Sequence, residues 1–167
     1  MAKQKIAVIG IGKIAQDQHL PVIDKSPDFE LAAVVSTRGV GHRDVPVFKT
    51  PAEFYKAMPE VKHVAICTPP GVRHAYVREA IDAGKDVLLE KPPTPTITEF
   101  EDLVTYGEKK GRVLFQTWHS RYNAAVDAAK LILKDEGVAT VRIDWRESVR
   151  KWHPGQEWVW EPGGFGV

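Results

Sequence analysis

The hydrophobic pattern of the first part of the chain alternates between two kinds of segment. Short runs rich in Val, Ile and Leu are apolar at nearly every position, which is typical of strands in a parallel sheet that is covered on both faces. The segments between them carry helix signals: capping boxes at 50–53 and 96–99, and glycines that end helices at Gly84 and Gly111. The predicted strands lie at residues 5–10, 29–36, 45–48, 61–67, 86–90 and 112–117, and predicted helices near 50–58, 72–83 and 96–111. Alternation at this spacing predicts an α/β fold with a doubly wound parallel sheet.

The pattern changes after Thr117. Residues 121–136 predict one amphipathic helix stopped by Gly137, and residues 140–147 alternate strictly between apolar and polar positions. Such alternation is typical of a half-exposed strand, unlike the buried strands before it. We therefore expect two domains: residues 1–120 with the parallel sheet, and residues 121–167 as the beginning of a truncated α+β domain.

Composition and charge exclude several classes of protein. Lys and Arg total 23 against 22 Asp and Glu, so the chain lacks the strongly basic balance of a nucleic-acid-binding protein. Uninterrupted apolar stretches are far shorter than the about 20 residues that span a bilayer, and we expect no signal peptide, because residues 1–5 lead directly into the first predicted strand. The single cysteine excludes an internal disulfide, and the histidines and carboxylates show no metal-ligand spacing. We expect a soluble, cytoplasmic protein with no metal, no nucleic-acid partner and no membrane partner.

A glycine-rich turn joins the first predicted strand to a helix. Residues 10–15 read Gly-Ile-Gly-Lys-Ile-Ala, a G-x-G-x-x-A motif. Gly10 permits the tight turn, Gly12 lets a diphosphate approach the backbone, and the small Ala15 lets helix and strand pack closely. The diphosphate would bind the free N–H groups of the helix N-terminus. Because the motif lies within a βαβ pattern, it predicts a Rossmann dinucleotide site rather than a merely structural turn.

The end of the second strand indicates which dinucleotide binds. NAD-binding folds usually place an acid there for the ribose 2′-OH, but this chain has Ser36, Thr37 and Arg38. Asp28 and Glu30 lie at the start of that strand, about 20 Å away at 3.3 Å per residue. A hydroxyl beside a guanidinium suits a 2′-phosphate, so we expect NADP to be preferred and NAD tolerated. The alternative is that Arg38 is a solvated loop charge.

Two further turns lie at the same edge of the predicted sheet. Residues 67–71 form a rigid Cys-Thr-Pro-Pro-Gly turn, in which Thr68 lines the cofactor cleft and Cys67 is a buried strand residue rather than a nucleophile. Residues 90–93 read Glu-Lys-Pro-Pro, and the proline biases Lys91 toward an extended conformation that directs its amine to the cleft. An ordinary exposed lysine remains the alternative. His19, within the first helix, is expected to be structural.

These motifs together resemble the glucose–fructose oxidoreductase / inositol dehydrogenase family. The resemblance rests on the glycine-rich turn, Glu90-Lys91-Pro92 and the closing Glu-Pro-Gly-Gly at 161–164. The phrases at 17–21, 117–121 and 152–156 are similar to those of bacterial L-arabinose and D-galactose 1-dehydrogenases. The resemblance implies oxidation of an aldopyranose at C1 to its lactone, with NADP or NAD accepting the hydride. It also implies a homo-oligomer for the intact enzyme and a cis peptide bond before Pro92.

The candidate site residues combine the motif analysis with this resemblance. The catalytic candidates are Lys91 and His153. The substrate-binding candidates implied by the resemblance are Lys91, His119, Glu147, Trp152 and His153. The cofactor-binding candidates are Gly10, Gly12, Lys13, Ile14, Ser36, Thr37, Arg38, Thr68, Pro69, His74, Glu90 and Lys91.

Alternatives remain for several of these residues and for the activity. A backbone-bonded structural histidine is the other interpretation of His119, and packing at a domain seam is the other interpretation of Trp152. The same scaffold could serve a dinucleotide-binding regulator without turnover, or act on an inositol or a biliverdin-like pigment. The presence of Lys91, His119 and His153 favours an enzyme, because a regulator without turnover does not need them.

Overall fold

The computed structural model describes residues 2–134, 137–144 and 146–160. The chain divides into two units, residues 1–117 and 118–167, close to the predicted boundary after residue 120. The assignment of the second unit to a substrate domain stays a prediction.

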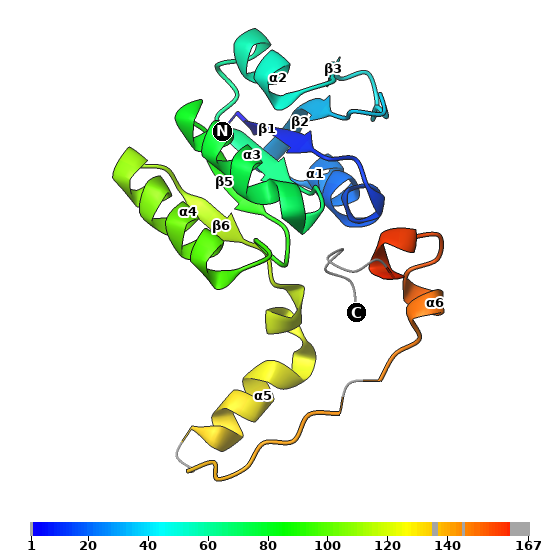
Figure 1. The fold of residues 1–167 in the computed structure, drawn as a ribbon, viewed down its shortest axis with the longest axis vertical. Helices are drawn as coiled ribbons and strands as arrows, with labels where there is room; N and C mark the ends of the chain where they lie inside the picture. Colours follow the sequence, from blue (N-terminus) through cyan, green and yellow to red (C-terminus); the bar gives the residue numbers. More distant parts are fainter. Residues whose placement is uncertain (1, 135–136, 145, 161–167) are drawn as a thin grey trace. The chain divides into compact units, whose positions relative to one another are not determined.

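The first unit contains a six-stranded sheet in which every pairing is parallel. The strand order is β3-β2-β1-β4-β5-β6, the order of a Rossmann fold, and it confirms the predicted doubly wound sheet (Figure 1). The two halves of the sheet diverge between β1 and β4, where ligands bind in such folds. The strands are β1 (Gln4–Ile9), β2 (Phe29–Val35), β3 (Val47–Phe48), β4 (His63–Ile66), β5 (Asp86–Leu89) and β6 (Leu114–Gln116).

Two helices of this unit, at 51–57 and 97–110, begin at the predicted capping boxes, and two, at 70–82 and 97–110, end just before the predicted glycines. The helix at 70–82 begins two residues earlier than predicted. The threonine side chains of both capping boxes accept from the backbone N–H three residues on, and the glutamate side chains accept from the threonine N–H groups. Gly84 and Gly111 follow α3 and α4 with φ of 72° and 63°, the left-handed region that favours glycine. The segments are a π-helical turn η1 (Ala15–His19), α1 (Leu20–Lys25), α2 (Pro51–Ala57), α3 (Pro70–Asp82) and α4 (Ile97–Lys110).

Two hydrophobic clusters cover the two faces of the sheet. On one face, Phe54 from α2, Val77 from α3 and Leu103 from α4 are fully buried against side chains of β1, β2, β4 and β5. On the other face, η1 and α1 contribute Ala15 and Leu20 against β1, β2 and β4. Alternate side chains of each central strand therefore enter different clusters, which is why these strands are apolar at nearly every position.

The edge strand β6 departs from the prediction of burial on both faces. Leu114 packs against the first cluster, but Phe115, on the opposite face, is 56% exposed. β6 pairs with β5 alone, and the buried residues of the second cluster come from elements nearer the centre of the sheet. The apolar sequence therefore identified a strand here but overestimated its coverage.

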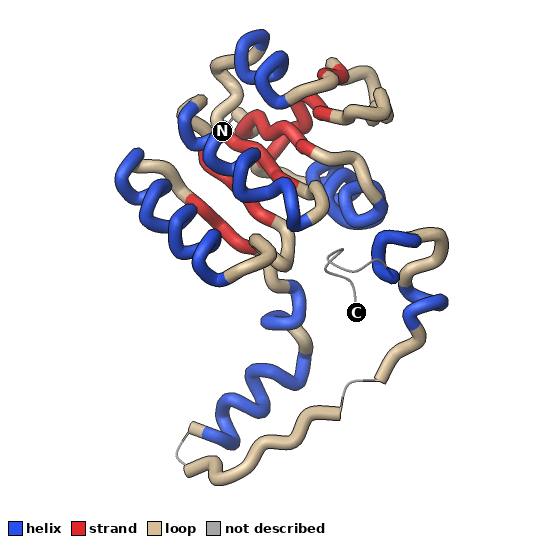
Figure 2. The backbone as a smooth tube through the Cα atoms, in the orientation of Figure 1, coloured by secondary structure: helices blue, strands red, loops and turns tan. Residues whose placement is uncertain are grey.

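The second unit consists of short helices and connecting loops in its described residues (Figure 2). The predicted helix at 121–136 is confirmed over α5 (Ala124–Leu133), with 135–136 outside the described residues. The predicted strand at 140–147 is wrong, because the described residues of that range form no strand. A strand needs a hydrogen-bonded neighbour, and the described part of this unit offers none. The segments are η2 (His119–Tyr122), α5 (Ala124–Leu133), α6 (Val149–Trp152) and η3 (Glu157–Trp160).

No helix in the described residues combines the length and the apolar composition needed to cross a bilayer.

Candidate active site

The carboxyl ends of the central strands of the first unit meet at one edge of the sheet. The N–H of Gly10 donates to the carbonyl of Val35 at 2.9 Å, and the N–H of Cys67 donates to the carbonyl of Ile9 at 2.8 Å. The glycine-rich turn therefore leaves β1 directly between the ends of β2 and β4. This is the switch point at which the sequence predicted a dinucleotide.

The two glycines of the turn meet different surroundings. Gly10 has φ of 92°, and a Cβ placed on it would lie 2.8 Å from Thr68 Cγ2 and 2.9 Å from Thr68 N. Only glycine accommodates both this conformation and this close approach of the β1 and β4 turns. A Cβ on Gly12 would have no atom within 4 Å. Gly12 thus borders open space, as a turn that admits a diphosphate requires.

The polar groups around this space fit a dinucleotide. Thr68 is 8% exposed, and its buried Oγ1 has no hydrogen-bond partner within the described residues. A buried hydroxyl without a partner is unfavourable by itself, and a ribose or amide group of a ligand could satisfy it. Lys13 is exposed and contacts Asp17, while Ile14 is 38% exposed. The cradle of Gly12 and the free hydroxyl of Thr68 are the observations that support this fit.

Arg38 reaches the glycine-rich turn from the end of β2. Its Nη2 donates to the carbonyl of Ile11 at 3.3 Å, although the side chain is otherwise exposed. Ser36 is buried, and its Oγ accepts from the N–H of Val40 at 3.0 Å, which shapes the loop, while Thr37 is exposed. The guanidinium of Arg38 therefore lies beside the predicted diphosphate turn rather than pointing freely into solvent.

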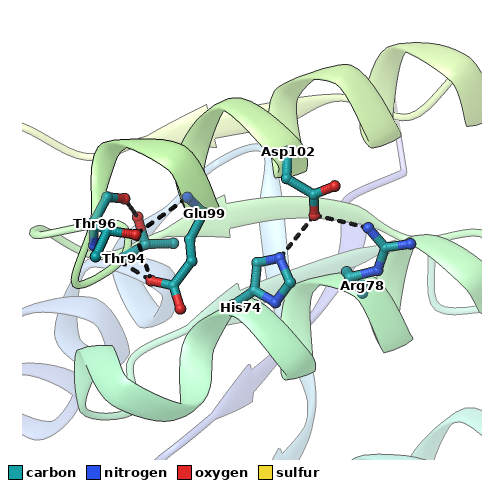
Figure 3. A network of polar contacts seen from close by, with 6 residues as sticks. All are labelled: His74, Arg78, Thr94, Thr96, Glu99 and Asp102. Atoms are coloured by element: carbon teal, nitrogen blue, oxygen red, sulfur yellow. Dashed lines mark hydrogen bonds and ion pairs between the residues drawn. The ribbon is translucent and has the colours of Figure 1, made fainter.

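The β4–α3 turn places Pro69 and His74 differently. Pro69 is exposed at the N-terminus of α3, beside Thr68. His74 Nε2 lies 2.7 Å from Asp102 Oδ2 on α4, and Arg78 Nη1 donates to the same oxygen at 2.7 Å. Figure 3 shows both side chains directed toward Asp102 across the two helices. These contacts hold the pKa of Asp102 below its usual range. His74 thus joins α3 to α4, and its assignment to the cofactor stays a prediction.

The carboxylate of Glu90 is the polar centre of this edge. It is 7% exposed, and Oε1 lies 3.0 Å from His19 Nε2 and accepts from Thr117 Oγ1 at 3.0 Å. Its other oxygen, Oε2, accepts from the N–H of Lys91 at 3.0 Å. Burial acts to raise the pKa of Glu90, but these hydrogen bonds outweigh it and lower that pKa. The ionised carboxylate therefore links the first helical turn, the end of β5 and the end of β6.

Lys91 follows Glu90 with an exposed side chain. The peptide bond from Lys91 to Pro92 is cis, as the family resemblance implied. Among the described residues, none forms a hydrogen bond or ion pair with Lys91 Nζ, so the amine is available to a ligand at this edge. The backbone carbonyls on either side of Lys91, of Glu90 and Pro92, both accept from Arg73.

Cys67 is buried, as predicted. Burial, reinforced by the charge of Glu90, raises the pKa of the Cys67 thiol to about 12. Because the thiolate is the reactive form of cysteine, this residue is not poised as a nucleophile at neutral pH.

The substrate candidates of the second unit lie in its short helices and the loops between them. His119 lies in η2, Glu147 is exposed in a loop, and Trp152 ends α6 with 54% of its surface exposed. His153 directly follows Trp152, and its Nδ1 lies 3.5 Å from Gln156 Oε1. His153 also lines a hollow of about 350 Å³ together with Arg150, Pro154, Gly155, Glu157 and Trp160. The roles of these residues toward a sugar stay predictions.

Two residues of the edge were missed or given a lesser role by the sequence analysis. His19, which was expected to be structural, binds the carboxylate of Glu90, which comes 71 positions later in the chain. Arg73 is 4% exposed and binds three backbone carbonyls. An arginine directly before His74 carries no sequence signal, because its partners are backbone groups brought close by folding. Within the described ranges, no three His, Cys, Asp or Glu side chains form a group that could hold a metal ion.

Comparisons with known proteins agree with this geometry. Residues 4–117 match the model of the GFO/IDH/MocA family, described as an oxidoreductase family with an NAD-binding Rossmann fold. The crystal structure of a D-galactose-1-dehydrogenase protein from Rhizobium etli has a TM-score of 0.90 and 42% sequence identity, covering 99% of this chain and 53% of that chain.

Curated relatives include galactose 1-dehydrogenase from Pseudomonas fluorescens, which is 40% identical over 95% of this chain and 51% of its own length. An NADP(+)-dependent scyllo-inositol 2-dehydrogenase from Bacillus subtilis is 29% identical over 70% of this chain and 33% of its own length. The chain thus spans about half or less of the length of these relatives. Its fold, its glycine-rich turn and the family match over residues 4–117 together show that the chain belongs to the GFO/IDH/MocA family of oxidoreductases with an NAD-binding Rossmann fold.

Proposed function

We propose that this protein is an NADP-preferring dehydrogenase that oxidises an aldopyranose, D-galactose or L-arabinose, at C1 to the lactone. The observation that carries the proposal is that the glycine-rich turn, Thr68 and Lys91 follow β1, β4 and β5, three neighbouring strands whose carboxyl ends share one edge of the sheet. Similarity to galactose 1-dehydrogenases over nearly the whole chain supports the sugar substrate.

The residues of the first unit would divide the work of binding. The turn at Gly10 and Gly12 would hold the diphosphate, because backbone N–H groups at a helix N-terminus bind anions. Arg38 would bind the 2′-phosphate, since its guanidinium is already held at the carbonyl of Ile11. Thr68 would donate its free hydroxyl to the nicotinamide half of the cofactor. When bound, the cofactor supplies the hydride acceptor for the sugar C1.

Lys91 would handle the proton of the reaction. Oxidation at C1 removes a hydride from carbon and a proton from the C1 hydroxyl, and the exposed amine of Lys91, when neutral, can accept that proton. The backbone of Lys91 is fixed by Glu90 on one side, so the amine starts from a defined point. We propose that residues from 118 onward belong to the sugar-binding part, in which His119, Glu147, Trp152 and His153 contact the pyranose. A tryptophan face suits the C–H surface of a sugar while its N–H can bind a hydroxyl.

Cofactor titrations test the first half of the proposal. The change in nicotinamide fluorescence would be measured as NADPH and then NADH are titrated with the chain. We expect NADPH to bind more tightly than NADH. Arg38→Ala should weaken the affinity for NADPH about 10–100-fold, because one charge-assisted hydrogen bond would be lost. Arg43→Ala is the matched control, because Arg43 is an exposed arginine of the same loop, paired with Asp24 at 2.9 Å. Equal affinities would overturn the NADP preference, and no binding of either cofactor would overturn the dinucleotide site.

A substrate panel tests the second half. The protein would be assayed for reduction of NADP with D-galactose, L-arabinose and scyllo-inositol. Turnover on the two aldopyranoses, with lactone as product, supports the proposal. Turnover on the inositol alone would favour a polyol dehydrogenase. The similarity to a scyllo-inositol 2-dehydrogenase is the observation that supports this alternative. Cofactor binding without any turnover would favour a nucleotide-binding regulator.

A further inference from the structure

Arg73 occupies an unusual place at the edge of the sheet. It lies in the first turns of α3 with 4% of its surface exposed. Its Nε donates to the carbonyl of Thr68 at 2.6 Å, and its Nη1 donates to the carbonyl of Glu90 at 2.5 Å and to that of Pro92. One buried side chain therefore bridges the turn after β4 and the turn after β5.

The guanidinium makes these bonds without a direct ionic partner. In the part of the chain that the structure describes, no carboxylate lies within ion-pair distance of Arg73. Burying a cation is unfavourable unless its donors are satisfied, and here backbone carbonyls satisfy them. Desolvation accordingly lowers the pKa of Arg73. Because the Arg73 guanidinium binds only main-chain oxygens, it fixes the main-chain path of the turns after β4 and β5 and does not position another side chain.

The residue enclosed by these bonds is Lys91. The carbonyls of Glu90 and Pro92 flank it in the chain, and its own N–H donates to Glu90 Oε2. The main chain is thus held before and after Lys91, although the Lys91 side chain is exposed. The third carbonyl bound by Arg73 belongs to Thr68, the residue that touches the glycine-rich turn.

We propose that Arg73 is a positioning residue that fixes Lys91 relative to the cofactor-binding turn at Thr68. The inference rests on the proposed function, because it assigns Arg73 an effect on a ligand through Lys91. Arginine suits this role since its planar guanidinium carries several donors in a fixed arrangement, whereas a lysine amine is a point donor on a flexible stem. A small displacement of Lys91 would be sufficient to weaken contacts that depend on its position.

Arg78 offers a matched control on the same helix. It lies one turn later on α3, is partly exposed, binds Asp102 on α4 and stacks 3.8 Å from the centre of the Tyr106 ring. It has no hydrogen bond to the turns at Thr68 or Lys91 among the described residues. Arg78→Lys therefore makes the same chemical change without touching the bridge.

The first measurement is amide hydrogen exchange at Lys91 followed by NMR on the whole chain without ligand. Arg73→Lys should speed exchange at this amide about tenfold, because the main chain around Lys91 would lose the stabilisation of about one hydrogen bond. Arg78→Lys should leave it unchanged. Amides of β1 report whether the variant remains folded, and Arg73→Gln, which keeps a planar group with two donors, is the second variant if Arg73→Lys does not fold. Unchanged exchange at Lys91 in a folded Arg73 variant would overturn the inference.

The second measurement is a double-mutant cycle on the affinity for NADPH. Arg73→Lys should weaken binding about tenfold, and Lys91→Ala should weaken it at least as much. If Arg73 acts through Lys91, the double variant binds within twofold of Lys91→Ala alone. A purely structural role of Arg73 predicts that the two effects multiply, and that result overturns the inference. A wild-type chain that binds no dinucleotide overturns the proposed function instead, while the exchange measurement still decides whether Arg73 restrains Lys91.

Discussion

Replacing Glu90 by glutamine removes a charge from the centre of the candidate site while preserving its shape. In the native carboxylate, one oxygen is bound by His19 and Thr117 and the other by the N–H of Lys91. Glutamine has one oxygen and one NH₂ group. If the oxygen stays with His19 and Thr117, the NH₂ faces the N–H of Lys91, so one charge-assisted bond is lost and two donors oppose each other.

The size of the effect follows from that count. A hydrogen bond to a charged group contributes about 1.5–3 kcal/mol, so Glu90→Gln should lower the free energy of unfolding by about that amount. At about 2–4 °C per kcal/mol for a chain of this length, the midpoint of thermal unfolding should fall by about 3–12 °C. Urea unfolding followed by circular dichroism measures the free energy directly.

The pH dependence makes the prediction more specific. The pKa of Glu90 is lower in the folded protein than in the unfolded chain, so its ionised form stabilises the fold. This contribution is complete above the unfolded pKa of about 4.3 and is lost as the pH falls through the lower folded pKa. The difference between wild type and Glu90→Gln should therefore be present at pH 7 and shrink below about pH 4.

Glu79→Gln provides the control. Burial raises the pKa of Glu79, and its side chain forms no hydrogen bond or ion pair among the described residues. Removing its charge should leave stability unchanged or slightly higher at pH 7. The reasoning is refuted if Glu90→Gln is as stable as wild type at pH 7, or if its deficit persists undiminished into acid.

Three further substitutions test other parts of the fold. Gly10→Ala should destabilise by about 2–4 kcal/mol and abolish NADPH binding, because φ is 92° and the new Cβ would meet Thr68 at 2.8 Å; a stable, binding-competent variant in urea unfolding and fluorescence titration would contradict this. Thr96→Ala should cost about 1 kcal/mol by removing the cap of α4, in which Thr96 and Glu99 bind each other (Figure 3); an unchanged thermal midpoint would show that the cap is dispensable. Phe54→Ala should cost about 3–5 kcal/mol in urea unfolding, since the ring is fully buried, and a loss below about 2 kcal/mol would mean that the core closes over the cavity.

The sequence predicted most of the first unit because its signals are local. The capping boxes, the helix-ending glycines and the glycine-rich turn each depend on a few adjacent residues, and all of them adopt the predicted conformation. The failures lie where a segment depends on a distant partner. The predicted strand at 140–147 has the correct alternation but no neighbouring strand in the described part of its unit. Phe115 belongs to a strand as predicted, yet half of its surface has no cover.

The candidate site divides in the same way. The residue types at the strand ends were sufficient to predict a dinucleotide turn, and the family match confirms an NAD-binding Rossmann fold. The sequence by itself determined that the turns with glycine, arginine and lysine follow strands, because the hydrophobic pattern locates each strand end and the turn residues are adjacent to it. Only the tertiary structure decided that His19 and Thr117 bind Glu90, and that Arg73 holds the main chain around Lys91. These partners are far apart in sequence, and the hydrogen bonds exist only because the parallel sheet brings its carboxyl ends to a single edge.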